Sequence, residues 1–423
     1  MQIPKEAEQI IERLNKAGFE AYVVGGCVRD TLLGKTPEDW DITTSAKPEQ
    51  VKAIFGRTID TGIQHGTVTI MKGKTGYEVT TYRIDGEYED GRHPKSVAYT
   101  SDLVEDLKRR DFTINAMAYN HEIGLVDVFE GMQDLECHKV RCVGDPMQRF
   151  LEDALRILRA IRFSAQLGFE IDPATKAAIT VNAPNLAQVS KERILAELTK
   201  LLLSDHPQQI SMVYETGISP YISPAFDRIR TGHPTGCQTE AVDQTGSGFE
   251  NPPLPPEKSL RWASFLHEIS AKEAVQILKD LKADGDTIAK VKILVEYGKT
   301  PIAANKTEIR RVMSGMTPEL YDRLLLLKRS LGGQAQAEGS MPSAYAEDLD
   351  AIEALSTEIR RDGDCVSKKA LAVTGNDLIQ SGMQPGQEMG ETLNRLFQLV
   401  LEHPEYNTQE QLLKIIATHS DQL

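Results

Sequence analysis

Two aspartates separated by one residue are the strongest candidates for chemistry in this sequence. Asp39 and Asp41 lie in the segment DWDIT, whose pattern predicts a strand, so both carboxylates should project from one face and Trp40 from the other. Paired carboxylates on one face suit Mg²⁺, which activates an attacking hydroxyl and stabilises a leaving pyrophosphate. Because a pair this short is also common in surface loops, it indicates metal-dependent phosphate chemistry only in the company of other motifs.

A third catalytic carboxylate usually completes such a site, and Glu78 is the candidate for it. It lies in the β-rich run YEVTTYR. The preceding segment from Gly73 to Gly76 is typical of a hairpin turn, which would return this strand alongside its neighbour. The assignment of Glu78 depends on that strand argument.

A glycine pair marks a candidate phosphate-binding turn. The β-rich run AYVV leads into Gly25 and Gly26, and we expect a helix to begin with Val28, Arg29 and Asp30. Glycines let the backbone turn tightly, so its N–H groups could approach a phosphate, to which Arg29 would add a charge-assisted hydrogen bond. The alternative is a plain strand-to-helix turn, which the glycine pair taken alone favours.

A charged run, DLKRRDFTIN, precedes the strand-like segment AMAY. Its arginines Arg109 and Arg110 could clamp phosphates, and Asp111 could accept a hydrogen bond from a ribose hydroxyl, a contact that separates ribonucleotides from deoxyribonucleotides. Asn115 closes the run and belongs to the same nucleotide-binding group. The alternative is a solvated run of charges.

The segment EDALRILRAIRF predicts a helix with Asp153 and Arg156 one turn apart. An ion pair on the helix surface is the simple interpretation. The functional interpretation is that the carboxylate accepts from an exocyclic amino group of a base while the guanidinium donates to the adjacent ring nitrogen. Cytosine and adenine present that pattern and uracil and guanine do not, so one pair could accept CTP and ATP and reject UTP and GTP.

The elements that must position these residues change in type along the chain. Residues 1 to about 138 alternate helical patterns with short β-rich runs, which predicts a mixed α/β domain, and after Pro146 helical periodicity continues to the end. A chain of 423 residues should form several domains. Two segments rich in loop-forming residues, 226–258 and LGGQAQAEGSMP after Ser330, are expected to be loops or linkers.

Composition limits the class of protein. The chain is 40% hydrophobic and holds no run of about 18 apolar residues, so we expect a soluble protein without a membrane span. Five scattered cysteines without a CxxC pair favour a reducing cytoplasm. The net charge of −14 argues against general attraction to RNA, although the arginines of the charged run and of the helix after it could form a local basic stripe.

Taken in order, GGCVRD, DWD, DLKRRDFTIN and EDALRILRAIRF resemble the class II tRNA nucleotidyltransferases, the CCA-adding enzymes of the polymerase β superfamily. The tail segment TGNDLIQSGMQPGQEMGETLNRL resembles the bacterial members that lack an HD domain. The resemblance implies an α+β fold in which a catalytic head with a mixed β-sheet, residues 1–138, precedes all-α domains. These would be a neck for base recognition (139–205), a body containing the linker-like segment 226–258 (206–303) and a tail for the tRNA elbow (304–423).

The resemblance also implies roles for single residues. It makes Asp39 and Asp41 the Mg²⁺ ligands, and it makes Asp153 and Arg156 the amino-acid template for the base. It assigns three further positions to the incoming nucleotide: Gly26, Arg29 and Arg110. Two more, Arg159 and Arg162, would face the triphosphate of that nucleotide.

The activity implied is addition and repair of the 3′-terminal CCA of tRNA from CTP and ATP, with release of pyrophosphate. Poly(A) polymerases resemble the same head but carry a basic Gly-Arg-Arg-Phe-type stretch where this chain has FGRTIDTGIQHGTVTI, which disfavours poly(A) addition. CC-adding enzymes lack the loop that this chain has between Arg83 and Ser96. An A-adding enzyme stays open, as does the choice between a monomer and a homodimer. A non-catalytic RNA-binding protein is the alternative from another class, and the intact pair Asp39 and Asp41 argues against it.

Overall fold

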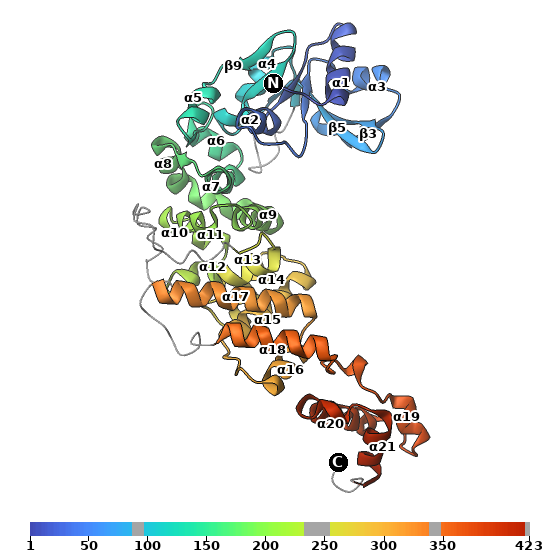
Figure 1. Cartoon of the computed structure of the whole chain (residues 1–423). Helices are drawn as coiled ribbons and strands as arrows, with labels where there is room; N and C mark the ends of the chain where they lie inside the picture. Colours follow the sequence, from blue (N-terminus) through green and yellow to red (C-terminus); the bar gives the residue numbers. More distant parts are fainter. Residues whose placement is uncertain (87–96, 232–253, 338–347, 419–423) are drawn as a thin grey trace. The chain divides into compact units, whose positions relative to one another are not determined.

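The computed structural model describes residues 1–86, 97–231, 254–337 and 348–418, which form two compact units (Figure 1). The first unit comprises residues 1–231 together with Lys279–Ala283. The second comprises residues 254–278 and residues 284–418. No helix in these ranges is long and apolar enough to span a membrane.

A seven-stranded mixed sheet organises the beginning of the first unit. Its strand order is β3-β4-β5-β2-β1-β8-β9; β2 and β5 run parallel, and the other neighbours are antiparallel. The strands are β1 (Ala21–Val24), β2 (Ile42–Thr44), β3 (Thr58–Gly62), β4 (Thr67–Lys72), β5 (Thr75–Thr81), β8 (Met117–Asn120) and β9 (Gly124–Asp127). This confirms the mixed sheet expected from the β-rich runs.

The central strands are buried because helices cover the sheet. All four residues of β1 are buried, and α1 presents Ala7, Ile10, Ile11 and Leu14 to the core at helical spacing. The helix α1 packs against both β1 and α3. The helices of this part are α1 (Lys5–Lys16), α2 (Gly26–Leu32), α3 (Pro48–Ile54), α4 (Leu103–Lys108) and α5 (Gly131–Glu136).

A two-stranded ribbon lies beside this sheet. Its strands β6 (Arg83–Asp85) and β7 (Val97–Tyr99) are antiparallel, with Asp85 opposite Val97. The ribbon frames the loop that the sequence predicts between Arg83 and Ser96, and residues 87–96 of that loop lie outside the described residues.

The rest of the first unit is helical, apart from the short parallel pair β10 (Lys139–Val140) and β11 (Glu170–Ile171). The helix α7 packs against α9, with Ile157, Leu158 and Ile161 buried on one side and Leu198 on the other. The helices are α6 (Pro146–Glu152), α7 (Leu155–Leu167), α8 (Pro173–Asn182), α9 (Lys191–Leu202), α10 (Met212–Glu215), α11 (Ser219–Ile222) and α12 (Pro224–Asp227).

One prediction of a helix and two predictions of loops need correction. The expected continuous helix through Asp153 is interrupted, because α6 ends at Glu152 and α7 begins at Leu155. The N-terminal edge of the expected linker is folded: Phe226 lies in α12 and is fully buried, while residues 232–253 lie outside the described part. The glycines after Ser330 do not end a helix, because the buried residues Leu324, Leu327 and Leu331 hold α17 in the core.

The second unit is all helical in the residues described, as the periodicity predicts. Its helices are α13 (Lys258–Phe265), α14 (Ala271–Asp280), α15 (Gly285–Gly298), α16 (Lys306–Ser314), α17 (Pro318–Ala337), α18 (Leu349–Asp362), α19 (Gly375–Gln380), α20 (Gln387–Glu402) and α21 (Gln409–Thr418). The last two residues of α14 are counted with the first unit. Short 3₁₀ turns complete the fold: η1 (Ile63–His65), η2 (Thr113–Asn115), η3 (Ala183–Gln188), η4 (Pro207–Ser211), η5 (Arg228–Thr231), η7 (Lys368–Ala370) and η8 (Pro404–Tyr406). The observed fold is therefore α+β, as expected, and the four-part division by residue number stays a prediction.

Candidate active site

The aspartate pair lies at the entrance to β2, not on it. The strand begins at Ile42, and Asp39 and Asp41 occupy the extended segment immediately before it. Even so, the Val24 N–H donates to the Asp41 carbonyl oxygen at 3.0 Å, so the backbone already follows the direction of the sheet. Ile42 is buried, whereas Asp39 and Asp41 are exposed. Both carboxylates therefore reach solvent from a rigid edge of the sheet.

Glu78 is brought to the same edge, as the hairpin argument predicts. The strands β4 and β5 are joined through Gly73, and β5 pairs with β2 so that Val79 lies opposite Ile42. Glu78 and Asp41 each precede their paired residue by one position, so they lie at neighbouring strand positions. Glu78 is exposed, like the aspartates.

The carboxylates concentrate negative charge at Asp41. Partial burial is the main cause that raises the pKa of Asp41; Arg110 lowers it, and the charges of Glu78 and Asp39 raise it further. A cation bound here would relieve the repulsion that Glu78 and Asp39 exert on the ionised form of Asp41. Within the described residues, no three His, Cys, Asp or Glu side chains are grouped tightly enough to enclose a metal by themselves. A cation held here would therefore need ligands from solvent or substrate.

The turn at Gly25 needs a glycine for two reasons. Its φ is +82° and its ψ is −128°, a conformation that L residues rarely adopt. A Cβ at this position would also lie 2.9 Å from Nη1 of Arg110. The helix α2 begins at Gly26, two residues earlier than expected, and a Cβ at Gly26 would make only an ordinary contact, at 3.7 Å from Nη2 of Arg29.

Arg110 lies between the glycine turn and the acidic edge. Its Nη2 is 3.7 Å from Oδ2 of Asp106, and its positive charge lowers the pKa of Asp41. Burial lowers the pKa of Arg110, an effect opposed by the carboxylates of Asp106, Asp41 and Asp111. Its buried Nε has no hydrogen-bond partner in the described chain, so it can still donate to an anion.

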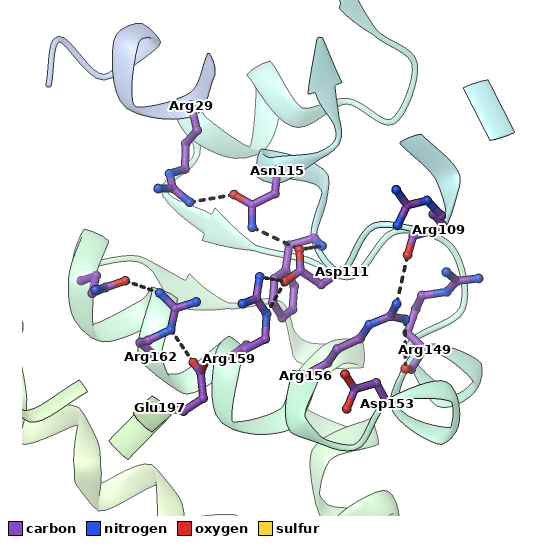
Figure 2. A network of polar contacts seen from close by, with 12 residues as sticks. Arg29, Arg109, Asp111, Asn115, Arg149, Asp153, Arg156, Arg159, Arg162 and Glu197 are labelled. Atoms are coloured by element: carbon purple, nitrogen blue, oxygen red, sulfur yellow. Dashed lines mark hydrogen bonds and ion pairs between the residues drawn. The ribbon is translucent and has the colours of Figure 1, made fainter. Parts of the chain in front are cut away.

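Figure 2 shows a chain of hydrogen bonds that joins Arg29 to Arg159. Nη1 of Arg29 donates to Oδ1 of Asn115 at 2.7 Å, and Nδ2 of Asn115 donates to Oδ1 of Asp111 at 3.1 Å. Nε of Arg159 then donates to Oδ2 of Asp111 at 2.7 Å. Three residues predicted to bind nucleotide, and a fourth from α7, are thus brought together from separate elements.

Asp111 is more enclosed than the sequence suggests. Both of its oxygens already accept hydrogen bonds, since Oδ1 also accepts from the Phe112 N–H at 2.9 Å. Burial would raise its pKa, but Arg159, Asn115 and Arg156 more than offset this effect and lower the pKa to about 2. A ribose hydroxyl would have to use the remaining lone pairs of this carboxylate.

Three arginines gather around the ring of Phe163. The guanidinium carbons of Arg29, Arg159 and Arg162 lie 5.0, 5.3 and 3.9 Å from the ring centroid. Arg162 is buried and already bonded: its Nε donates to Oε2 of Glu197 at 2.6 Å and its Nη1 donates to Gln166 at 2.7 Å. Arg159 is more open than Arg162, with a side chain 33% exposed against 8%.

The predicted template residues each have partners of their own. Oδ1 of Asp153 accepts from the Leu155 N–H at 3.0 Å, and Oδ2 accepts from Nη2 of Arg193 at 2.8 Å. Arg156 instead donates to Glu152 at 2.7 Å and to the carbonyl oxygen of Arg109 at 3.0 Å. The helix is interrupted between the two residues, and each side chain has charged partners of its own.

Sequence reasoning missed three residues of this network. Asp106 is fully buried beneath Arg109 and Arg110 although it belongs to a run that looks solvated. Arg193 and Glu197 come from α9 and meet Asp153 and Arg162 across 40 and 35 residues. No local pattern indicates such distant partners.

Sequence families define the class of this protein. Residues 21–141 match the poly A polymerase head domain, and residues 168–229 match a family described as "Probable RNA and SrmB- binding site of polymerase A". Residues 255–416 match domain 2 of tRNA nucleotidyltransferases. The mixed sheet with its acidic edge thus lies in the part that matches a polymerase head domain, and the helices after it match two families described by RNA binding and by tRNA nucleotidyl transfer.

Curated and solved relatives narrow the class. The chain is 39% identical to the CCA-adding enzyme of Lacticaseibacillus paracasei, over 98% of this chain and 96% of that one. It is 38% identical to the CCA-adding enzyme of Leuconostoc mesenteroides, over 93% and 92% of the two chains. The structure of the Bacillus stearothermophilus CCA-adding enzyme in complex with CTP matches the whole of both chains, with a TM-score of 0.77 and 30% identity.

The chain belongs to the family of CCA-adding enzymes. It is accordingly an enzyme, a tRNA nucleotidyltransferase, and its function is CCA addition to tRNA. Among the activities that the sequence leaves open, family membership favours this one over A addition alone, poly(A) addition and RNA binding without catalysis.

Proposed function

We propose that nucleotide transfer takes place at the acidic edge of the sheet, between Asp39, Asp41 and the turn at Gly25. There the 3′-hydroxyl of tRNA attacks the α-phosphate of CTP or ATP, and pyrophosphate leaves. The observation that carries this proposal is the grouping of Asp39 and Glu78 around Asp41, beside an arginine, Arg110, with an unbonded buried donor. In the neighbouring helices, Arg159, Arg162 and Arg193 each pair with a carboxylate.

Asp39 and Asp41 would hold a divalent cation, for which we propose Mg²⁺. The fit follows from the crowding of negative charge at Asp41, and an ion with only two protein carboxylates suits Mg²⁺, which keeps waters and substrate phosphates as its other ligands. When bound, the ion would lower the pKa of the attacking hydroxyl and neutralise charge on the leaving phosphates. Glu78 would add negative charge at this edge.

Phosphate recognition would fall to Arg110, Arg29 and the backbone at Gly25 and Gly26. Nε of Arg110 is buried and unbonded in the described chain, so a phosphate oxygen would satisfy it without breaking an existing bond. Arg29 is anchored by Asp30 and Asn115, which fixes its position before substrate arrives. Arg159 would extend this positive surface toward the triphosphate.

Base selection would fall to Asp153 and Arg156, on either side of the break between α6 and α7. Their present partners hold both side chains in place: Arg193 binds the carboxylate and Glu152 binds the guanidinium. A cytosine or adenine edge would share or replace these partners, while uracil and guanine would face a carboxylate without a donor. Both nucleotides would then use one pocket.

The metal-binding assignment is tested by Asp39→Ala and Asp41→Ala. Each change should lower kcat for CTP and ATP by at least about a thousandfold, because several kcal/mol of charge stabilisation in the transition state are lost. Asp60→Ala is the matched control, since Asp60 lies on β3 of the same sheet and pairs with Lys52 at 2.8 Å. Full activity of the folded Asp39→Ala and Asp41→Ala variants would refute the assignment.

The base-reading assignment is tested by Asp153→Ala and Arg156→Ala. Discrimination of CTP and ATP against UTP and GTP should fall by about 10- to 100-fold, in line with the worth of a bidentate contact to a base. Transfer of the correct nucleotides should fall less. Unchanged discrimination in both variants would exclude a base-reading role.

The use of one pocket for two nucleotides is tested with tRNAs that end before the first C, after one C and after two. Each is supplied with CTP, ATP or both. Sequential addition with mutual competition between CTP and ATP is expected, whereas additive rates without competition would point to two pockets. We place this activity in the cytoplasm, where tRNA and nucleoside triphosphates meet, with the helical parts after the head holding the acceptor arm and elbow of the tRNA.

A further inference from the structure

Asp106 is a fully buried carboxylate with partners on two strands and at the end of its own helix, α4. Its Oδ2 accepts from Oγ1 of Thr43 on β2 at 3.0 Å, and its Oδ1 accepts from the Arg83 N–H at the start of β6 at 3.3 Å. Arg109 completes the set through Nε at 2.9 Å and Nη2 at 2.8 Å. A buried charge with this many fixed donors is held in one place.

Arg110 lies within the influence of two competing carboxylates. It forms an ion pair with Asp106 at 3.7 Å, and in the described chain it forms none with Asp41, although each influences the charge of the other. Its Nη1 rests against the turn at Gly25, in space that only a glycine leaves open. The position of the guanidinium therefore depends on attraction from Asp106 on one side and from Asp41 on the other.

We propose that Asp106 is a positioning residue that keeps the Arg110 guanidinium beside Gly25 and away from Asp41. Asp41 then stays available to a metal ion, and the free Nε of Arg110 stays available to a phosphate. Asp106 itself touches neither, since Thr43, Arg109 and Arg110 surround its carboxylate. This inference rests on the proposed roles of Asp41 and Arg110.

Loss of the Asp106 charge has a definite consequence. Arg109 and Arg110 would be left side by side without the carboxylate that both now contact. Asp111 offers Arg110 little, because Arg159 and Asn115 already occupy its oxygens. Arg110 would then turn to Asp41 and compete with the metal for its carboxylate.

The test is the variant Asp106→Asn in the full chain, without nucleotide or tRNA. Binding of Mn²⁺ is measured from the electron paramagnetic resonance signal of the free ion. Affinity for Mn²⁺ should fall about tenfold, which corresponds to about 1.4 kcal/mol. The double variant Asp106→Asn/Arg110→Gln should regain at least the original affinity, because no arginine remains to occupy Asp41. A merely structural defect would not be cured by a second substitution.

A matched control comes from the same helix. Asp102 caps α4 by accepting from the Val104 N–H at 2.8 Å and is exposed, so Asp102→Asn should leave Mn²⁺ binding unchanged. Unchanged affinity in Asp106→Asn, or a loss that persists in the double variant, would overturn the proposal.

Two further variants decide the matter if Asp106→Asn does not fold. Arg110→Gln alone should tighten Mn²⁺ binding, and Thr43→Val, which removes one hydrogen bond to Asp106, should weaken it about two- to threefold. The opposite directions, or no change in either, would refute the positioning role. Asp41→Ala separates the two proposals: if it leaves Mn²⁺ binding intact, the metal assignment itself fails.

Discussion

Gly25 leaves space that the guanidinium of Arg110 occupies, so a side chain at position 25 would clash with it. Gly25→Ala should cost about 1–3 kcal/mol of folding stability, because a side chain is strained at φ +82°. It should also raise KM for CTP and ATP about tenfold or more, since the new Cβ would displace Arg110 from the proposed phosphate site. Urea unfolding and steady-state kinetics measure the two effects.

Gly18→Ala separates strain from displacement. Gly18 has φ +83° and nothing within 4 Å of its added Cβ, so its substitution should lower stability without changing KM. Equal KM changes in both variants would show that loss of stability, and not the position of Arg110, governs nucleotide binding.

Asp111 gives a prediction for acid stability. Its pKa is about 2 in the folded chain against an ordinary value of 3.8, so its ionised form stabilises the fold by about 2 kcal/mol above pH 3.8. Because the folded pKa is the lower one, this contribution is lost as the pH falls from 3.8 through about 2. The difference in unfolding free energy between the native chain and Asp111→Asn should stay constant from neutral pH to about pH 5 and shrink below pH 3.8. A difference independent of pH would contradict it.

Residue types and spacing predicted the candidate residues but not their partners. Asp39, Asp41 and Glu78 could be placed at one edge because strand pairing and a hairpin turn follow from local pattern. The hydrogen bond from Arg193 to Asp153 could not be predicted, because the two residues are 40 positions apart in sequence and meet only through the packing of α7 against α9. The same holds for the buried side of the charged run, where tertiary packing turns Asp106 inward.

At the scale of elements, the break between α6 and α7 shows the limit of periodicity. Apolar spacing runs through Asp153 without interruption, yet the chain leaves the helix there with φ −144° and ψ 101°. The side chain of Asp153 then caps the next helix by accepting from the Leu155 N–H, a role that short polar residues perform at helix starts. Side-chain capping can thus divide a helix that hydrophobic spacing leaves whole.

In the second unit, one arginine ties two helices together. Arg310 of α16 is buried, and it donates to the carbonyl oxygen of Leu401 at 2.7 Å, at the end of α20, and to Asp364 at 2.7 Å. Arg310→Gln should lower the unfolding free energy by about 3 kcal/mol, since it leaves the mostly buried carboxylate of Asp364 and a helix end without their charged partner. Chemical denaturation measures this change.

Its neighbour provides the comparison. Arg311 is exposed and pairs with Glu308 and Glu402 at the surface, so Arg311→Gln should leave the unfolding midpoint almost unchanged. Similar losses in the two variants would mean that α16 depends on charge in general and not on the buried contacts of Arg310.

On the scale of the whole molecule, a net charge of −14 must coexist with an RNA substrate. Binding should therefore depend on few, localised cations and be weak for RNA in general. Lys368 and Lys369 are adjacent and exposed on η7, in the part proposed to hold the tRNA elbow. Replacing both by Ala should weaken tRNA binding and lower the slope of log K against log salt by about two, one for each lysine. An unchanged slope would place the elbow contact elsewhere.

The ribbon of β6 and β7 has a consequence for how this protein can evolve. Asp85 of β6 lies opposite Val97 of β7, so the pairing of these two strands holds the two ends of the intervening segment at a fixed separation. When two paired strands fix the ends of a connecting segment, the length of that segment has little effect on the rest of the fold. Doubling the length of a flexible loop adds only about 0.6 kcal/mol to the entropic cost of closing it. A change in the number of residues between 86 and 97 should therefore leave the register of β6 with β7 unchanged, so any effect of such a change on activity would come from the segment itself.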